Sequence, residues 1–261
     1  MSTSFRIVWN MLRRHVTSPY LFLWRTVELL AIIKLARRHG YDLTGRLDLD
    51  AGCGNGIVGQ AVVAQIGIGI DTEAPQLAMA RRAATYQALL RASATAIPLS
   101  DRSQDSALCN CVMEHISDDA AAFAELARVL APGGYLLLTL ASRDLYRAAF
   151  GTDDVDPQLR HDLDASLAHA HYYDAAGVTR RLELLGLEVL TAAPYMAPRQ
   201  ASRWIALRTY QARQPRNGLR GRLAQLRRIP TTLGTLPLLW PVLAAPAIGA
   251  GLAVVARRPL E

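Results

Sequence analysis

The stretch "LDLDAGCGNGIVGQ", residues Leu47 to Gln60, places four glycines within eight residues, directly after an apolar run that ends in an aspartate. Glycines between a strand and a helix let the backbone turn sharply and approach a bound ligand closely. Other residues of the chain indicate which ligand such a bend would bind.

Two glycine patterns overlap in this stretch. Gly54, Gly56 and Gly59 match GxGxxG, the fingerprint of dinucleotide-binding folds, in which a pyrophosphate lies at a helix N-terminus. The second pattern is the acid Asp50 followed by GxGxG over residues 52–56. A carboxylate at this point would repel a pyrophosphate, whereas it would attract the ammonium group and, at longer range, the sulfonium of S-adenosylmethionine. Asp50 therefore favours the second pattern.

The segments around the loop alternate between short apolar strands and alanine-rich helices. This alternation of strands and helices predicts a doubly wound, mostly parallel sheet. We expect strands at Leu47–Asp50, Ile66–Asp71, Ala107–Val112, Tyr135–Leu140 and Leu187–Thr191, helices at Ile57–Val63, Pro75–Leu90, Asp118–Leu130 and Asp174–Leu185, and a turn at Pro132. Before them, the first 40 residues read as helical, with Ser18 as a cap, Pro19 in the first turn and Gly40 at the end. Residues 193–232 read as irregular.

Two further features narrow the ligand. Asp71 ends the second strand 21 residues after Asp50, where its carboxylate is placed to accept hydrogen bonds from two ribose hydroxyls. The segment "ALCNCVMEHISDDAAAFAELARVLAPGGYLLLTL" then adds a strand, a helix and a Pro-Gly-Gly turn into another strand. Together these residues resemble the class I S-adenosylmethionine-dependent methyltransferases, in particular the small-molecule group that includes ubiquinone and menaquinone methyltransferases. The resemblance extends from about residue 47 to residue 140, with weaker support to residue 189.

The resemblance implies a fold and a cofactor site. The implied fold is α/β, with a doubly wound, Rossmann-like sheet of seven strands that ends in an antiparallel strand at Gly251–Ala256. A helical cap (residues 1–45) would precede the cofactor-binding domain (46–192), and a basic and apolar extension (193–261) would follow it. The implied contacts to S-adenosylmethionine are Asp50, Ala51, Gly52, Gly54, Asn55, Gly56, Asp71, Thr72, Ser93, Ala94 and Asn110. Ser93 departs from the family, which often has an acid there.

The catalytic residues are less strongly indicated. Methyl transfer is an in-line displacement, so alignment matters most, and a base is needed only if the acceptor must lose a proton. Our candidates are His115, which follows Glu114 after the fourth strand, and His171 and Tyr172 within "HAHYY". A structural role for His115 is at least as plausible. His169 and His171 could share one side of an extended segment, but no third metal ligand is identifiable, so we expect no metal.

The charge distribution suggests partners. Residues 1–46 carry a net charge of +6, residues 47–198 carry −9 and residues 199–261 carry +10. The run Thr231–Ala256 has no charged residue, is interrupted by three prolines and has arginine pairs on both sides. We expect it to form an apolar lid or to dip into a membrane interface rather than to span the bilayer. With three cysteines, no CxxC pair and no secretory signal, we expect a cytoplasmic protein.

We therefore expect an enzyme that methylates a small, apolar or lipid-like metabolite, with peripheral membrane contact as a further expectation and the oligomeric state open. The alternative is an RNA methyltransferase or a nucleic-acid-binding protein that uses the basic flanks, although few aromatic residues accompany the C-terminal arginines. A cofactor-binding relic without activity is a third reading.

Overall fold

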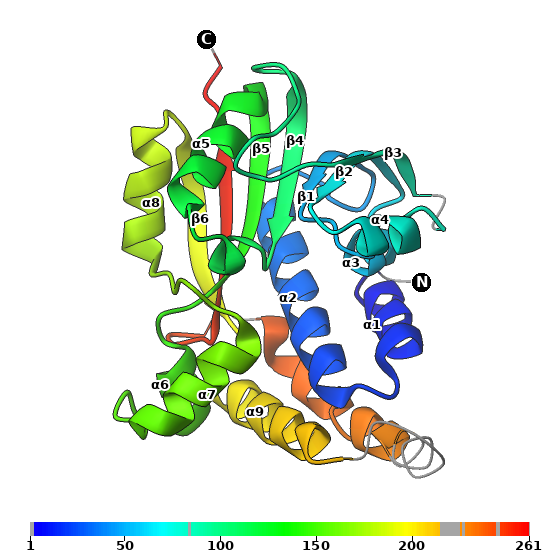
Figure 1. The fold of residues 1–261 in the computed structure, drawn as a ribbon, viewed down its shortest axis with the longest axis vertical. Helices are drawn as coiled ribbons and strands as arrows, with labels where there is room; N and C mark the ends of the chain where they lie inside the picture. Colours follow the sequence, from blue (N-terminus) through cyan, green and yellow to red (C-terminus); the bar gives the residue numbers. More distant parts are fainter. Residues whose placement is uncertain (1–2, 83–84, 215–224, 226–227, 244–245, 261) are drawn as a thin grey trace.

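A single seven-stranded sheet organises the computed structural model, which describes residues 3–82, 85–214, 225, 228–243 and 246–260 (Figure 1). The strand order is β3-β2-β1-β4-β5-β7-β6, and β7 alone is antiparallel to its neighbours. This confirms the predicted fold class. The strands are β1 (Arg46–Ala51), β2 (Gln65–Asp71), β3 (Tyr86–Arg91), β4 (Gln104–Asn110), β5 (Leu130–Ala141), β6 (Glu188–Tyr195) and β7 (Gly251–Arg257).

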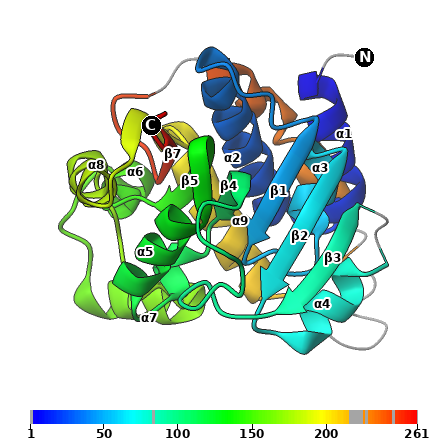
Figure 2. The ribbon, with the colours of Figure 1, turned by 90° about the horizontal axis from the view of Figure 1, so that it is seen from above.

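Helices cover both faces of the sheet, as Figure 2 shows from above. One face packs against α1 (Thr3–His15), α2 (Pro19–Arg38), α3 (Ile57–Val62) and α9 (Pro198–Ala212), and the other against α5 (Asp119–Val129) and α8 (Ala175–Leu184). The helix α4 (Ala74–Ala80) packs on β2 and β3. Beyond the carboxyl ends of the strands, α6 (Leu145–Phe150) and α7 (Pro157–Leu167) lie beside α9 (Figure 1). Two short 3-10 helices, η1 (Met113–His115) and η2 (Leu236–Leu243), complete the elements.

The expected helical cap consists of the two helices α1 and α2. Pro19 occupies the first turn of α2, and Gly40 follows its end with a left-handed φ of 83°. The expected capping by Ser18 is wrong, because the Ser18 side chain makes no cap bond and instead accepts a hydrogen bond from the Gln211 amide at 3.1 Å. This residue therefore ties the cap to α9.

The predicted helix over Pro75–Leu90 is wrong in its second half. Helix α4 ends at Ala80, residues 83 and 84 lie outside the described residues, and residues 86–91 form the edge strand β3. Alanine and leucine favour a helix in isolation, but pairing with β2 decides the outcome here. Because most of β3 is exposed, its sequence lacks the apolar alternation that would have indicated a strand.

The structure also differs from the prediction in four other segments. The Pro-Gly-Gly segment lies within the continuous strand β5, where an irregular register replaces the expected turn. Helices α6 and α7 were not predicted, and residues 198–212, expected to be irregular, form α9. Trp204 anchors α9, because its buried ring packs against the Trp24 ring of α2 with centroids 4.6 Å apart and an interplanar angle of 45°.

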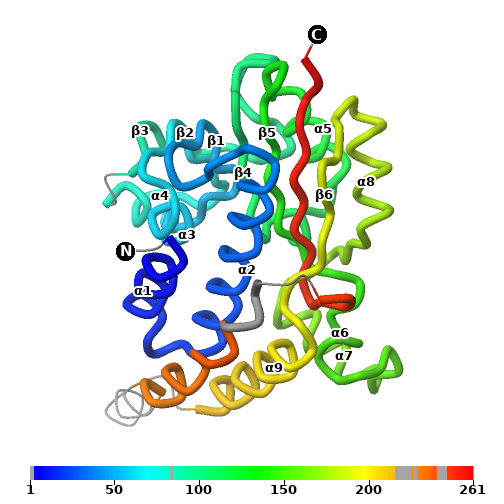
Figure 3. The backbone as a smooth tube through the Cα atoms, turned by 180° about the vertical axis from the view of Figure 1, so that it is seen from behind, coloured from blue at the N-terminus to red at the C-terminus, as the bar shows by residue number. Residues whose placement is uncertain are grey.

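The antiparallel strand β7 fills the gap between β5 and β6 (Figure 3). Its expected position at residues 251–256 is confirmed to within one residue. Gly251 pairs with Tyr195, whose ring would lie 2.1 Å from any Cβ at position 251, so only glycine fits. Within the described residues, no helix is long and apolar enough to cross a membrane. The uncharged run 231–256 begins with helical residues 231–233 and contains η2 and β7, with residues 244–245 outside the described part.

Candidate active site

The glycine loop after β1 has the left-handed backbone that its sequence requires. Gly52, Gly54 and Gly56 have φ angles of 75°, 52° and 75°. A Cβ at Gly52 would lie 2.4 Å from the Val112 side chain, whereas a Cβ at Gly54 would meet no atom within 4 Å. Gly52 thus permits close packing inside the protein, while Gly54 presents an open backbone surface to a ligand.

Asp71 joins the end of β2 to this loop. One carboxylate oxygen accepts a hydrogen bond from the Gly54 amide at 2.8 Å, and the other accepts one from the Glu73 amide at 2.9 Å. A carboxylate oxygen can accept more than one hydrogen bond, so both oxygens retain capacity for a ribose hydroxyl. The structure thus brings Asp71 and Gly54 together, as the proposed ribose site requires.

Asp50 lies buried at the end of β1. Its carboxylate accepts a hydrogen bond from the Tyr86 hydroxyl at 2.6 Å and is 4% exposed. Burial raises the pKa of the Asp50 carboxyl to about 6, and the charge of Asp71 adds to this effect. Tyr86 escaped the sequence analysis because it was assigned to a helix. The site therefore contains a buried carboxyl group that a nearby cation would stabilise in its ionised form.

The other expected cofactor residues surround the same loop. Asn55 accepts a hydrogen bond from the Ile57 amide at 3.1 Å, and Ala51 is buried in β1. The Ser93 hydroxyl is 2.7 Å from the Thr95 hydroxyl and accepts a hydrogen bond from the Thr95 amide, so it is engaged within its own turn. Ala94 is buried after β3, and Thr72 is exposed after β2, where its carbonyl accepts a hydrogen bond from Arg91.

Asn110, at the end of β4, leads to a residue that sequence analysis missed. Its amide nitrogen donates to the Glu28 carboxylate at 3.2 Å, while its oxygen Oδ1 is buried with no hydrogen-bond partner among the described residues. Glu28 lies on α2, 82 residues earlier in the chain. An element of the cap therefore reaches the centre of the site.

Glu28 is fully buried and accepts hydrogen bonds from five side chains. Besides Asn110, the donors are Arg25 at 2.9 Å, Cys111 at 2.6 Å, Thr139 at 2.9 Å and Tyr195 at 3.2 Å. Burial, followed by the charge of Glu28, raises the pKa of the Cys111 thiol, and burial likewise raises the pKa of the Tyr195 phenol. Both groups therefore remain protonated donors at neutral pH. The available signal in the sequence was a lone acid inside the apolar run of α2.

Cys109 and Cys111 are two residues apart, a spacing that would point both side chains to one face of a strand, but the structure separates them. Cys109 is buried in β4 against the α5 face, whereas Cys111 follows the strand with a φ of 48° and packs on the α2 face. This change of side places Cys111 beside Glu28.

A cavity of about 160 Å³ opens beside the Glu28 cluster. Its walls combine aromatic, basic and titratable groups, contributed by Tyr20, Leu21, Trp24, Arg25, Cys111, Glu114, His115, Ser166, Leu167, His169, Trp204 and Arg208. Burial raises the pKa of the Glu114 carboxyl to about 7, and its oxygen Oε2 has no hydrogen-bond partner in the described part of the chain. We call this space the acceptor cavity, after the role that we propose for it below.

His115 points one ring nitrogen at the backbone. Its Nδ1 lies 2.9 Å from the Ala168 carbonyl oxygen, which can only accept, so Nδ1 carries the proton. In the neutral ring, Nε2 then carries the lone pair. The His169 ring lies 5.2 Å from that of His115, and burial, followed by the charge of His115, lowers the pKa of His169 to about 4.

The three expected catalytic residues do not line one cavity. His171 and Tyr172 border a second cavity of about 160 Å³ with Asp119, Arg143 and Arg181. His171 Nε2 lies 3.2 Å from the Ser117 carbonyl oxygen, and the Tyr172 hydroxyl donates to Asp164. The expectation that His169 and His171 share one side of the chain is therefore wrong.

His169 instead faces a different pair of residues. The ligating atoms of Glu114, His115 and His169 all lie within 4.8 Å of one another. This set of one carboxylate and two imidazoles could hold a divalent transition metal. It supplies the third ligand that the sequence did not reveal, although it replaces His171 with His115.

Comparison with known proteins identifies the family that this chain resembles. The family described as "Methyltransferase domain" matches residues 49–138. The chain is 35% identical to a malonyl-[acyl-carrier protein] O-methyltransferase of Yersinia pestis over 51% of this chain and 49% of that protein. It is 31% identical to the protein of the same name from Serratia marcescens over 73% of this chain and 76% of that protein. The chain thus spans about half the length of the Yersinia relative.

Two other similarities bear on the expected subgroup and fold. A ubiquinone biosynthesis O-methyltransferase of Acinetobacter baylyi is 27% identical over 41% of this chain and 48% of that protein. A solved S-adenosylmethionine-dependent methyltransferase of Thermotoga maritima, described as a possible histamine N-methyltransferase, superposes with a TM-score of 0.57. It is 16% identical and covers 96% of this chain and 99% of that chain. This last likeness concerns the fold alone.

We predict that Gly52→Ala destabilises the protein more than Gly186→Ala does. Both glycines have left-handed φ angles, 75° and 79°, but an added Cβ meets the Val112 side chain only at position 52. Overpacking should make the loss in unfolding free energy larger by roughly 1–3 kcal/mol at Gly52. Urea denaturation of both variants measures the difference, and equal losses would contradict the packing argument.

Replacing Glu28 should be costly even though the residue lies outside the sheet. Glu28→Ala leaves five donors without their acceptor, including the Arg25 guanidinium, and should lower the unfolding free energy by roughly 3–5 kcal/mol. Glu28→Gln keeps one acceptor oxygen and should lose less.

The matched control is Glu183→Ala on the exposed side of α8, which should change stability by less than about 0.5 kcal/mol. If Glu28→Ala unfolded as late in urea as this control, the inferred role of the buried cluster would be wrong.

Proposed function

Because the chain belongs to the class I S-adenosylmethionine-dependent methyltransferases, we propose that it methylates a small, apolar metabolite carrying an anionic group. The observation that carries this proposal is the composition of the acceptor cavity, which lies next to the ends of β4 and β5 and joins aromatic walls to arginines. The bound cofactor supplies an electrophilic methyl group. The residues of this chain have to bind, orient and shield the two reactants.

The residues at the loop fit this cofactor. Asp50 provides a buried carboxyl group for a cationic ligand, Gly54 provides an open backbone and Asp71 retains acceptor capacity for a ribose. The unpartnered Oδ1 of Asn110 offers one more acceptor at the end of β4. We therefore assign the methionine side of the cofactor to Asp50 and Asn110 and the ribose to Asp71. Buried acceptors of this kind are costly unless a donor reaches them.

The acceptor cavity supports an apolar substrate with a negative end. Trp24 and Trp204 contribute aromatic wall, and Arg208, one turn after Trp204 on α9, is held by the Ser166 carbonyl at 2.6 Å and by the Tyr20 ring. Arg208 makes no ion pair with an acid within the described part of the chain, so a carboxylate or phosphate of the substrate could pair with it. The volume of about 160 Å³ suits a small reacting group rather than a nucleotide.

Two groups in this cavity could take a proton from the substrate. His115 Nε2 carries the lone pair when Nδ1 donates to Ala168, and Glu114 has a pKa of about 7, so a large fraction of it is ionised at neutral pH. We assign the base to His115, which is exposed and better able to contact substrate, and a supporting role to Glu114. His171 and Tyr172 border the other cavity, so we do not assign them to the methyl acceptor.

The nucleic-acid alternative gains no support from the described residues. It depends on the C-terminal arginines, of which Arg216, Arg220, Arg222 and Arg227 lie outside the described part of the chain. Of those described, Arg208 faces the acceptor cavity.

The test of the proposed function uses labelled S-adenosylmethionine. Incubation with a cell extract should move tritium from the methyl group into an organic-phase product.

Asp71→Ala should weaken cofactor binding by roughly 1.5–3 kcal/mol in calorimetry, the scale of a hydrogen bond to a charged group. Asp105→Asn, an exposed acid on β4, is the control and should bind normally. Undiminished affinity of Asp71→Ala would count against the cofactor site, and transfer into RNA alone would overturn the acceptor class.

Cofactor affinity should also depend on pH through Asp50. Its pKa of about 6 means that the carboxyl is mostly protonated at pH 5, whereas a cationic ligand favours the ionised form. Affinity should therefore rise about tenfold from pH 5 to pH 7 and level off above that. Calorimetry at several pH values measures this, and Asp50→Asn should bind more weakly and lose the rise. A rise that persists in Asp50→Asn would assign it to another group.

A further inference from the structure

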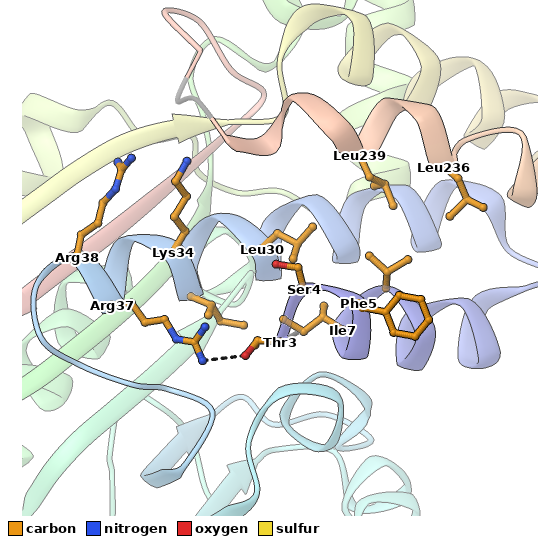
Figure 4. A pocket seen from close by; sticks show the side chains of 12 residues that line it. Thr3, Ser4, Phe5, Ile7, Leu30, Lys34, Arg37, Arg38, Leu236 and Leu239 are labelled. Carbon is orange, nitrogen blue, oxygen red and sulfur yellow. Dashed lines mark hydrogen bonds between the residues drawn. The ribbon is translucent and has the colours of Figure 1, made fainter. Parts of the chain in front are cut away.

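A second and larger cavity lies on the cap, away from the loop and the Glu28 cluster. It is a groove of about 710 Å³ between α1, α2 and η2 (Figure 4). Its walls are mainly apolar, contributed by Ile7, Val8, Leu30, Ile33, Leu236 and Leu239. None of these six residues lines the acceptor cavity. The proposed methyl transfer does not use this groove, which we call the cap groove.

The charges of the cap groove are all of one sign and lie at one end. Lys34, Arg37 and Arg38 line it, and no acidic residue does. Arg37 is paired with Asp42 at 3.1 Å, whereas Lys34 and Arg38 have no ion pair among the described residues. Figure 4 shows the side chains of Lys34 and Arg38 extending from the same side of α2, at the end opposite Leu236 and Phe5. Burial, followed by the charge of Arg38, lowers the pKa of Lys34, which an anion placed between them would counteract.

The outer surface beside the groove is also apolar. Phe5 and Trp9 lie one turn apart on α1 and are 53% and 47% exposed. Tryptophan at such a position is typical of surfaces that enter the interface of a bilayer. The first 46 residues, which contain α1 and α2, carry a net charge of +6. A negatively charged surface would therefore attract this side of the molecule.

We propose that the cap groove seats one acyl chain of an anionic phospholipid in a bilayer, with its phosphate between Lys34 and Arg38 and with Phe5 and Trp9 in the interface. A lipid chain has one charged end and an apolar body, which is the distribution that the groove walls match. A second copy of this chain would have to bring an anionic end to Lys34, and the cap helices that line the groove are themselves basic. This site is independent of methyl transfer and would place the enzyme at the membrane surface.

The test is flotation of the full chain with vesicles. Vesicles of phosphatidylcholine containing phosphatidylglycerol should carry the protein, and vesicles of phosphatidylcholine alone should not. Lys34→Glu should weaken binding roughly tenfold, whereas Arg180→Glu, the same charge change on exposed α8, should weaken it less than about twofold. Trp9→Ser should also weaken binding, and its control is Leu184→Ser, since Leu184 is 88% exposed on α8.

A second measurement reports whether Trp9, beside the groove, enters the bilayer. Phospholipid brominated along its acyl chains should quench tryptophan emission in the wild type and should quench less in Trp9→Phe. Every variant should unfold at the urea concentration that unfolds the wild type, which shows that the variants are folded without relying on the proposed function.

Three results would overturn the proposal. Equal losses of vesicle binding for Lys34→Glu and Arg180→Glu would show that binding is due to general charge attraction. Saturable binding of monomeric oleate with no binding to vesicles would assign the groove to a free anionic amphiphile. A dimer in gel filtration that Trp9→Ser dissociates, without vesicle binding, would assign it to a second copy of the chain.

Discussion

The buried carboxylate of Glu28 is the interaction on which the arrangement of the site depends. Five donors from α2, β5, β6 and the end of β4 converge on it, so the cap helix and three strands are fixed to one another at a single point. A fully buried charge is costly without partners and tightly held with them. The acceptor cavity lies against this cluster and shares Arg25 and Cys111 with it. The shape of the cavity therefore depends on a residue of the cap.

The cofactor side of the site has a different design. Two carboxylates, Asp50 and Asp71, stand on neighbouring strands around the glycine loop, and each is held by a contact that fixes its direction. Asp50 depends on Tyr86 of the edge strand β3, and Asp71 depends on the backbone of the glycine loop. Burial makes the ionised form of Asp50 unfavourable when no cation is near. The protein thus retains an electrostatic cost that a cationic ligand would remove.

The sequence contained much of this architecture but little of the acceptor site. The glycine loop, Asp50, Asp71 and the alternating strands follow from local chemistry, since left-handed backbone favours glycine and a nucleoside ligand favours an acid where a strand ends. Glu28, Tyr86 and Tyr195 act through contacts between residues that are far apart in sequence, and no local pattern shows which partner each will meet. Strand β3 and helix α9 were missed because pairing and the Trp24–Trp204 contact, rather than propensity, decide their conformation. The prediction that His169 and His171 share one side was wrong because the backbone bends at residue 170, so the two rings meet different partners.

The position of β7 between β5 and β6 has a consequence for synthesis on the ribosome. Strand β6 has no partner in the sheet other than β7, and Glu188 pairs with Arg257, which is 69 residues further along the chain. Until those residues leave the exit tunnel, β6 cannot be incorporated, and Tyr195 cannot rest on Gly251 to reach Glu28. A nascent chain would therefore hold a five-stranded sheet with an open apolar edge at β5, which is a natural target for chaperones. Closure of that edge and completion of the buried cluster would then occur in one late event.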